Sequence, residues 1–262
     1  MVKDKHIISE INGFFHKNDC NKAINSIMTT IRHLNFRSSC IGFEKRHNCK
    51  LTCLQVLELL LVFPFFMNKN SFQCNHSGLS KLFSCQKDMF YRFMNQDNID
   101  WRKLVYQVSL CLLNRISSRK DSKTSLQCLI VDDTDLQKTG LRTALIGHIY
   151  SHVLHRSVLG FKGLFLCHTE GKTQTMLDFS LHGEEGKNPE KSQGLTEKQR
   201  KARFSKEHDE DSMTNTRVKE YRQSKIDRSI EMVKEAIKKG ILRKTIAYNN
   251  LGSDIGRGIF KA

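Results

Sequence analysis

The amino-acid sequence predicts an α+β protein, with a helical N-terminal domain at residues 1–117 followed by a sheet-containing domain at residues 126–262. Two observations predict this class. In the first domain, apolar residues recur every three or four positions, as on one face of a helix. In the second domain, short apolar runs end at turn residues, as strands do. The polar stretch SRKDSKTS between the two domains predicts a linker.

Apolar spacing places the expected helices of the first domain. They lie at residues 7–15, at residues 23–34, within the apolar stretch 54–67, and at residues 101–116. The third begins at a capping box of Thr52 and Gln55 and is ended by Pro64. Its apolar stretch of 14 residues is too short to cross a bilayer, which predicts a buried helix and no membrane span.

Residues 77–96, SGLSKLFSCQKDMFYRFMNQ, divide into two short helical stretches around a polar break. That layout suits a helix-turn-helix, whose second helix would lie in the major groove of DNA with Lys87 and Arg92 near phosphates. The alternative is an ordinary helical hairpin in which Phe90, Phe93 and Met94 belong to the core. Spacing alone leaves both interpretations open.

Three strands are predicted in the second domain, at residues 126–132, 161–168 and 175–181. The first contains an almost unbroken apolar run, which is typical of a central strand covered on both faces. The turn TEGK at residues 169–172 predicts a hairpin between the other two.

Polar and charged residues dominate 183–215, which predicts a long surface excursion. A helix is expected after it, at about residues 216–239, with Gly240 as its C-terminal stop. The expected apolar face of this helix consists of Ile226, Ile230, Val233 and Ile237.

The chain is strongly basic, with a formal net charge of +16, and the excess is uneven. Residues 1–125 carry 19 Lys and Arg against 9 Asp and Glu, whereas residues 126–181 carry 5 of each. A surface this basic attracts a polyanion and gains affinity by releasing its counterions, so we expect a nucleic acid as partner. Nine cysteines without a secretory signal predict free thiols in a reducing compartment, the cytoplasm.

Two groups of cysteines and histidines are weaker signals for a metal site. The cysteines between residues 49 and 85 have a loose spacing, and buried cysteines commonly act as small hydrophobes. His148, His152 and His155 have the i, i+4, i+7 spacing of one helix face, but no acid accompanies them at a zinc-protease spacing. We expect these histidines near a nucleic-acid backbone or simply at the surface.

The stretch LQCLIVDDTDLQKTG at residues 126–140 places three acids, Asp132, Asp133 and Asp135, directly after the apolar run of the first strand. Carboxylates held at the end of a buried strand can bind Mg²⁺ ions, which activate a water or a 3′-hydroxyl for phosphoryl transfer. Asp132 and Asp133 point to opposite sides of an extended strand, so only one would be the principal ligand. The alternative is a turn rich in Asp and Thr.

Longer segments resemble bacterial insertion-sequence transposases of the DDE class. They include VDDTDLQKTG, the stretch that begins YSHVLHRSVLGFKGLFLCHTEGK, and GLTEKQRKARFSKEHDEDS. The segments KLTCLQVLELLLVFPFF and KDMFYRFMNQDNIDWRKL fit the helical DNA-binding region of the same group. The resemblance extends over nearly the whole chain to about Ile241. It implies a ribonuclease-H-like α/β core that cuts DNA and joins 3′-hydroxyls to a target.

This resemblance also implies site residues and partners. Asp133, directly before the Thr of the DDT block, would be the first catalytic metal ligand, with Asp132 as the alternative. Mg²⁺ or Mn²⁺ is the implied cofactor. Double-stranded DNA at the terminal inverted repeats of the element is the implied partner, with Lys138, Lys87 and Arg92 as DNA contacts. A homodimer and a bacterial cytoplasmic location, associated with the nucleoid when DNA is bound, are further expectations.

The chain also departs from the family pattern. After Gly240 it reads ILRKTIAYNNLGSDIGRGIFKA, with no segment like the Asp-Ser-Trp-Phe that would hold a second catalytic aspartate. The Y-x2-R-x3-E-x6-K pattern of the third carboxylate is missing as well. We therefore predict a truncated copy with an incomplete core, in which missing strands leave an edge of the first strand exposed. Such a copy would not cleave or join DNA alone, because one strand end cannot clamp two metal ions.

Two other functions remain open. A truncated copy that occupies element ends would block the intact enzyme, and would then be a DNA-binding regulator without catalysis. Alternatively, the apolar strand followed by Asp133-Thr134-Asp135 loosely resembles the strand end of haloacid-dehalogenase phosphotransferases. That family expects a small or hydroxyl residue where this chain has Gln137.

Overall fold

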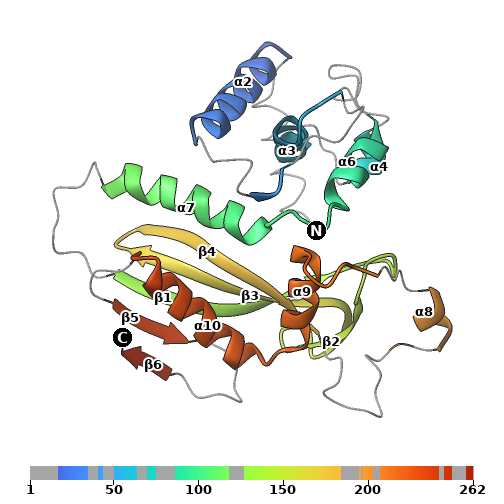
Figure 1. The fold of residues 1–262 in the computed structure, drawn as a ribbon, viewed down its shortest axis with the longest axis vertical. Helices are drawn as coiled ribbons and strands as arrows, with labels where there is room; N and C mark the ends of the chain where they lie inside the picture. The colour runs from blue at the N-terminus through green and yellow to red at the C-terminus, as the bar shows by residue number, and fades with distance from the viewer. Residues whose placement is uncertain are drawn as a thin grey trace. The chain divides into compact units, whose positions relative to one another are not determined.

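The chain divides into two compact units, Met1–Gln96 and Asp97–Ala262 (Figure 1). The computed structural model describes residues 17–34, 41–43, 50–63, 70–74, 86–117, 127–183, 195, 197–202, 207–241, 245–249 and 258–261. The predicted helix at residues 7–15 and the first part of the predicted helix-turn-helix lie outside these residues. Among the described helices, none is long and apolar enough to cross a membrane.

The described elements of the first unit are helices. They are α2 (Lys17–His33), α3 (Cys53–Val62), α4 (Ser71–Cys74) and α6 (Lys87–Met94). The predicted capping box of α3 is confirmed, because Gln55 N donates to Thr52 Oγ1 at 3.3 Å and Thr52 N donates to Gln55 Oε1 at 2.8 Å. Buried Glu58 of α3 accepts from Arg32 Nε of α2 at 3.0 Å, which ties these two helices together.

The second unit is built around one mixed sheet. Its strands are β1 (Gln127–Gln137), β2 (Gly147–Ser151), β3 (Arg156–Glu170), β4 (Thr173–His182), β5 (Thr245–Asn249) and β6 (Gly258–Lys261). The order is β2-β3-β1-β5-β6, and β4 also pairs with β3. Strand β1 is antiparallel to β3 and parallel to β5. The predicted TEGK hairpin is confirmed between β3 and β4, where Gly171 takes the positive φ of 59° that the turn needs.

Two predictions about the sheet are wrong. Strand β1 was expected to end at residue 132, yet it continues to Gln137 because β3 pairs with it along its whole length. The second edge of β1 was expected to be exposed, yet β5 covers it from Gln127 to Val131. Strands β2, β5 and β6 were not predicted.

Four helices of the second unit are described, namely α7 (Trp101–Ser117), α8 (Glu197–Ala202), α9 (Met213–Arg222) and α10 (Lys225–Lys238). Met232, Val233 and Ala236 of α10 pack on the sheet, in a cluster that Leu113 of α7 also joins, so both helices cover the same face. Helix α7 therefore lies with the sheet, although the sequence grouped it with the N-terminal helices. The assignment of residues 1–117 to DNA binding stays a prediction.

Helix α10 has the expected position and stop but a different inward face. Gly240 follows it with φ of 72°, as a C-terminal stop requires. The expected face included Ile237, which is 37% exposed. The buried residues are Arg228, Ser229, Met232, Val233 and Ala236. The inward face includes Arg228, which pairs with Asp178 of β4 and Glu220 of α9. The spacing of apolar residues carries no information about such ion pairs, so it predicted a different face.

Candidate functional site

The three acids of the DDT block lie inside strand β1 rather than beyond its end. Asp133 is paired with Leu164 of β3 and Asp135 with Lys162 of β3. On the opposite edge of β1, pairing with β5 stops at Val131. The acids therefore begin where the parallel neighbour ends, and β3 holds their backbone in an extended conformation.

Asp132 and Asp133 point to opposite faces of the sheet, as the alternation of a strand requires. Asp133 faces α10, where Lys225 Nζ donates to its Oδ2, and only 18% of its side chain is exposed. Asp132 is exposed, and its Oδ1 accepts from the backbone N–H of Asp133 at 3.0 Å. The prediction that the two side chains point to opposite sides of the strand is confirmed, and the prediction that only one of them is the principal metal ligand stays a prediction.

Asp135 lies on the same side of β1 as Asp133 and also has a lysine partner. Lys162 is its cross-strand neighbour on β3 and donates to its Oδ1, with both side chains nearly buried. Burial alone would raise the pKa of Asp135, but hydrogen bonds from Lys162 and Ser151 and the charge of Lys162 lower it below its ordinary value. Asp135 is therefore held as a carboxylate.

These acids do not fit a two-metal site as they stand. No described group of three or more His, Cys, Asp or Glu is arranged to hold a metal ion. Lys225 already brings to Asp133 the positive charge that an ion would supply, and Asp132 lies on the other face. The roles of Asp133 and Asp132 as ligands, and of Mg²⁺ or Mn²⁺ as cofactor, stay predictions.

A second set of charges, which the sequence reasoning missed, lies between β4 and the helices. Asp178 of β4 pairs with Arg102 Nε of α7 at 2.6 Å and with Arg228 Nη2 of α10 at 3.1 Å. Glu220 of α9 pairs with Arg102 Nη2 at 2.5 Å. We call these four residues the ion-pair network. It joins one strand and three helices, and three of its members are at least nine-tenths buried.

Burial and pairing compete in this network. Burial raises the pKa of Asp178, and the nearby charges of Arg102 and Arg228 do not fully offset it. At Glu220 burial also raises the pKa, but the hydrogen bond and charge of Arg102 outweigh it and the net shift is downward. The only sequence signal was an acid, Asp178, inside the apolar stretch MLDFSL. A charged residue at a core position of a strand predicts a buried partner of opposite charge, but it does not indicate which residue that partner is.

Comparison with known protein families matches residues 79–245 to the DDE superfamily endonucleases. The match covers more than half of the 262 residues. The chain belongs to this family. No curated protein and no solved structure gave a significant match.

As a DDE superfamily endonuclease, the chain is a transposase-like nuclease. The matched segment contains α6, α7, the antiparallel strands β1 to β4 and helices α8 to α10, and it ends at the first residue of β5. It therefore includes the DDT block of β1 and every member of the ion-pair network. The mixed sheet and helices agree with the predicted α+β class.

The DNA contacts predicted for this endonuclease lie on different elements. In α6, Lys87 Nζ lies 5.2 Å from the centre of the Phe72 ring, and exposed Arg92 donates through Nε to the carbonyl of Asp88 at 3.3 Å. Lys138 belongs to the second unit, where its backbone N–H donates to Leu159 at 2.8 Å and its side chain is exposed. Their contact with DNA stays a prediction.

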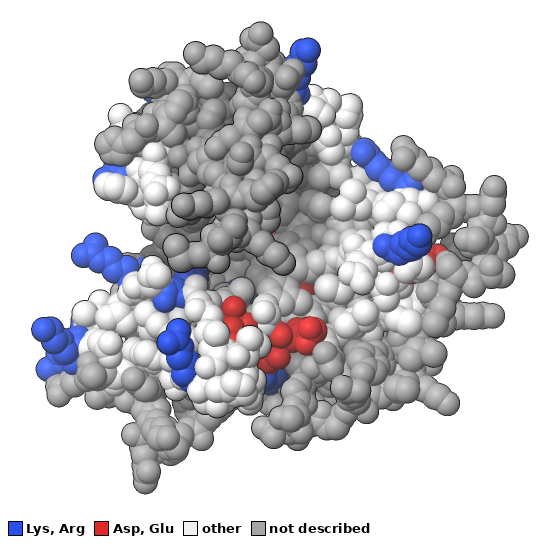
Figure 2. All heavy atoms as spheres, turned by 180° about the vertical axis from the view of Figure 1, so that it is seen from behind, with Lys and Arg blue, Asp and Glu red and all other residues white. Residues whose placement is uncertain are grey.

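The three histidines do not share a helix face, as their spacing suggested. His148 lies in β2, whereas His152 and His155 lie in the turn that leads to β3. On the face of the endonuclease seen in Figure 2, the described Lys and Arg side chains lie apart from one another, whereas several Asp and Glu side chains are neighbours. Within either unit, the described Lys and Arg residues of this face therefore form no continuous basic patch.

Proposed function

We propose that this endonuclease acts in DNA transposition at the ends of an insertion sequence, with Asp133 as the first carboxylate of its catalytic site. The position of Asp133 carries the proposal. It lies on the central strand β1, next to the point where pairing with parallel β5 ends, and its side chain is mostly enclosed beneath α10. Membership of the family supports endonucleolytic cleavage as the reaction class, and transfer of the cut strand is part of the proposal.

We further propose that this chain binds element ends without cutting them by itself. The described neighbour of Asp133 is Lys225 rather than a second acid. The residue of β5 in register with Val131 is Asn249, an amide, and residues 242–262 contain a single acid, Asp254.

The experiment combines a binding assay and a nicking assay on one DNA fragment that carries the terminal inverted repeats. In a gel-shift assay the protein is expected to bind this fragment more tightly than a scrambled fragment. No nicking of either fragment is expected with Mg²⁺ or Mn²⁺. Nicking that disappears in Asp133→Asn would refute the proposal that the catalytic site is incomplete, but it would be consistent with the proposed role in transposition. Equal affinity for repeat and scrambled DNA would overturn the role in transposition.

A DNA-binding regulator is the second candidate. The lysine held against Asp133, in a described region without a three-ligand metal group, favours it. A regulator would reduce strand cleavage by an intact transposase of the same element in proportion to its own affinity for the ends. Lys87→Gln with Arg92→Gln should relieve this inhibition. Lys234→Gln with Lys238→Gln, two exposed lysines of α10, is the control matched for the loss of two charges.

A further inference from the structure

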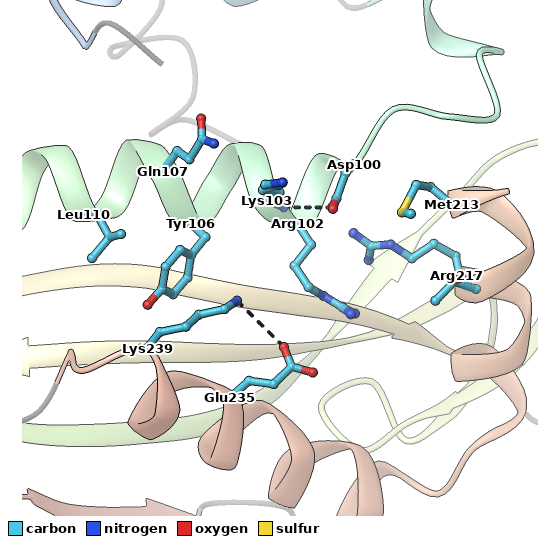
Figure 3. A pocket seen from close by; sticks show the side chains of 11 residues that line it. Asp100, Arg102, Lys103, Tyr106, Gln107, Leu110, Met213, Arg217, Glu235 and Lys239 are labelled. Atoms are coloured by element: carbon cyan, nitrogen blue, oxygen red, sulfur yellow. Dashed lines mark hydrogen bonds and ion pairs between the residues drawn. The ribbon is translucent and has the colours of Figure 1, made fainter. Parts of the chain in front are cut away.

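A pocket of about 570 Å³ lies beside the ion-pair network, on the face of the sheet covered by helices (Figure 3). Helix α7 contributes Tyr106 and Gln107, helix α9 contributes Arg217, and Lys239 follows the end of α10. All of them belong to the second unit. The volume falls in the range of about 300–1,000 Å³ that small-molecule sites occupy.

Arg217 brings a positive charge to this pocket that no described acid pairs with directly. Its Nη1 donates to the carbonyl of Phe179 at 3.2 Å, and its guanidinium lies 4.4 Å from the Phe179 ring centre. Its Nη2 is buried without a hydrogen-bond partner among the described residues. Burial first, and then the charge of Arg102, lower the pKa of Arg217, and the charges of Glu220, Asp178 and Asp100 offset this shift only in part.

Two more polar atoms of α7 lack partners among the described residues. Tyr106 is only 8% exposed, and its hydroxyl makes no hydrogen bond there; neither does the buried Oε1 of Gln107. Burial raises the pKa of Tyr106 to about 12, so the hydroxyl keeps its proton and can donate. Buried polar groups almost always have partners. Figure 3 shows the Gln107 side chain directed away from Tyr106, Lys239 and Arg217, so the Tyr106 hydroxyl and Arg217 Nη2 are the two described atoms at this cavity that indicate a missing ligand.

The remaining lining determines the ligand chemistry. Lys239 Nζ lies 4.1 Å from the centre of the Tyr106 ring and 3.9 Å from Glu235 Oε2. Asp100 and Glu235 are the acids of the lining, and they are outnumbered by Arg102, Lys103, Arg217 and Lys239. Leu110 and Met213 add apolar surface at its two ends. An arginine fork and a hydroxyl donor suit phosphate oxygens, and apolar surface suits the face of a base.

We propose that this pocket binds a nucleoside phosphate, with the phosphate on Arg217 and Tyr106. The nucleotide is either free or the terminal nucleotide of a single DNA strand. This proposal rests on a nucleotide ligand and not on an inverted repeat. A titration without binding would therefore refute the pocket, whereas equal binding of repeat and scrambled DNA would refute the role in transposition.

Isothermal titration calorimetry of the whole chain tests the pocket, with 2′-deoxyadenosine monophosphate, inorganic phosphate and a 5′-phosphorylated DNA tetramer as probes. The mononucleotide should bind more tightly than phosphate. Arg217→Met should weaken it about tenfold or more and Tyr106→Phe about fivefold, as expected for the loss of a charged and a neutral hydrogen bond. Tighter binding of the tetramer would identify a DNA strand as the source, and binding of the mononucleotide alone would identify a free nucleotide.

Arg222→Met is the matched control, because Arg222 is an exposed arginine of the same helix α9 and does not line the pocket. Equal affinity in Arg217→Met and Arg222→Met, or no heat with any probe, would overturn the site. Phosphate binding as tightly as the mononucleotide would overturn the part played by the base. If Arg217→Met does not fold, Tyr106→Phe decides alone, because it removes only a hydroxyl that no described residue contacts.

Discussion

Two sets of charged residues lie on the same sheet and differ in how they are held. In the DDT block of β1, Asp133 and Asp135 each have one lysine partner, and Asp132 is exposed. In the ion-pair network, Arg102 and Arg228 each contact both Asp178 and Glu220, Arg228 also contacts Glu231 and Glu235, and four elements contribute. Asp133 can exchange its partner when one lysine moves. The network can change only if a strand and three helices move.

The two sets of charges should differ in how much the free energy of unfolding falls when one partner is removed. A buried pair gains little over apolar packing, because desolvation of the charges offsets their attraction. Removing one partner is costly, because the remaining charge stays buried without compensation. The network therefore fixes the relative positions of α7, α9, α10 and β4 more than it adds net stability. The DDT block, which is partly solvated, tolerates the loss of a partner better.

The largest effect is expected from Arg228→Met. It leaves Asp178 with Arg102 alone and should lower the free energy of unfolding by about 3–5 kcal/mol, as for other broken buried pairs. Urea denaturation followed by circular dichroism measures it. Glu231→Gln is the control, because Glu231 contacts the same arginine but is 49% exposed, and its loss should cost less than about 1 kcal/mol. Equal losses in the two variants would contradict the role assigned to burial.

A smaller effect, dependent on pH, is expected at the Asp135–Lys162 pair. The pKa of Asp135 is lowered from its ordinary 3.8, so the pair stabilises the fold above that value and its contribution is lost as the pH falls through the lowered pKa. Wild type and the double variant Asp135→Asn, Lys162→Met, which leaves no buried charge alone, should be compared by urea denaturation from pH 7 to pH 2. A stability difference that stays constant over this range would refute the pairing.

Local patterns in the sequence predicted what local interactions determine. The capping box of Thr52, the glycine of the TEGK turn and the stop at Gly240 each depend on neighbours within a few positions, and all three are confirmed. The position of the DDT block on a central strand followed from its apolar run. The family match agrees with the resemblance that the same block carries.

Interactions between distant residues were not predictable in the same way. Arg102 and Glu220 are 118 positions apart, and no periodicity connects them. Pairing with β3 keeps Asp133 and Asp135 in a strand although Asp has low strand propensity. The histidine spacing at residues 148–155 fitted a helix, but β3 pairs with residues 147–151 and makes them a strand. In each case a partner far along the chain overrides the local preference.

The smallest change in stability, and the sharpest test of the comparison, is expected for Lys225→Met. Lys225 is partly exposed, so its removal should cost about 1 kcal/mol or less. The Asp133 carboxylate, however, loses the cation that competes with a metal ion, and the affinity of the chain for Mn²⁺ should rise about tenfold, equivalent to about 1.4 kcal/mol. Electron paramagnetic resonance of free Mn²⁺ measures this.

The gain should disappear when Asp133→Asn is added to Lys225→Met, and Lys225→Arg, which keeps the charge, should behave like wild type. Unchanged Mn²⁺ affinity in Lys225→Met would mean that the Lys225 ammonium does not compete with a metal ion for the Asp133 carboxylate. Arg228→Met in the network offers a contrast, because Asp178 keeps Arg102 as a partner, is 5% exposed and lies beneath the helices, so Mn²⁺ affinity should not rise. A carboxylate that is both released from its cation and reachable from solvent would then separate a site that can accept an ion from one that only holds the fold.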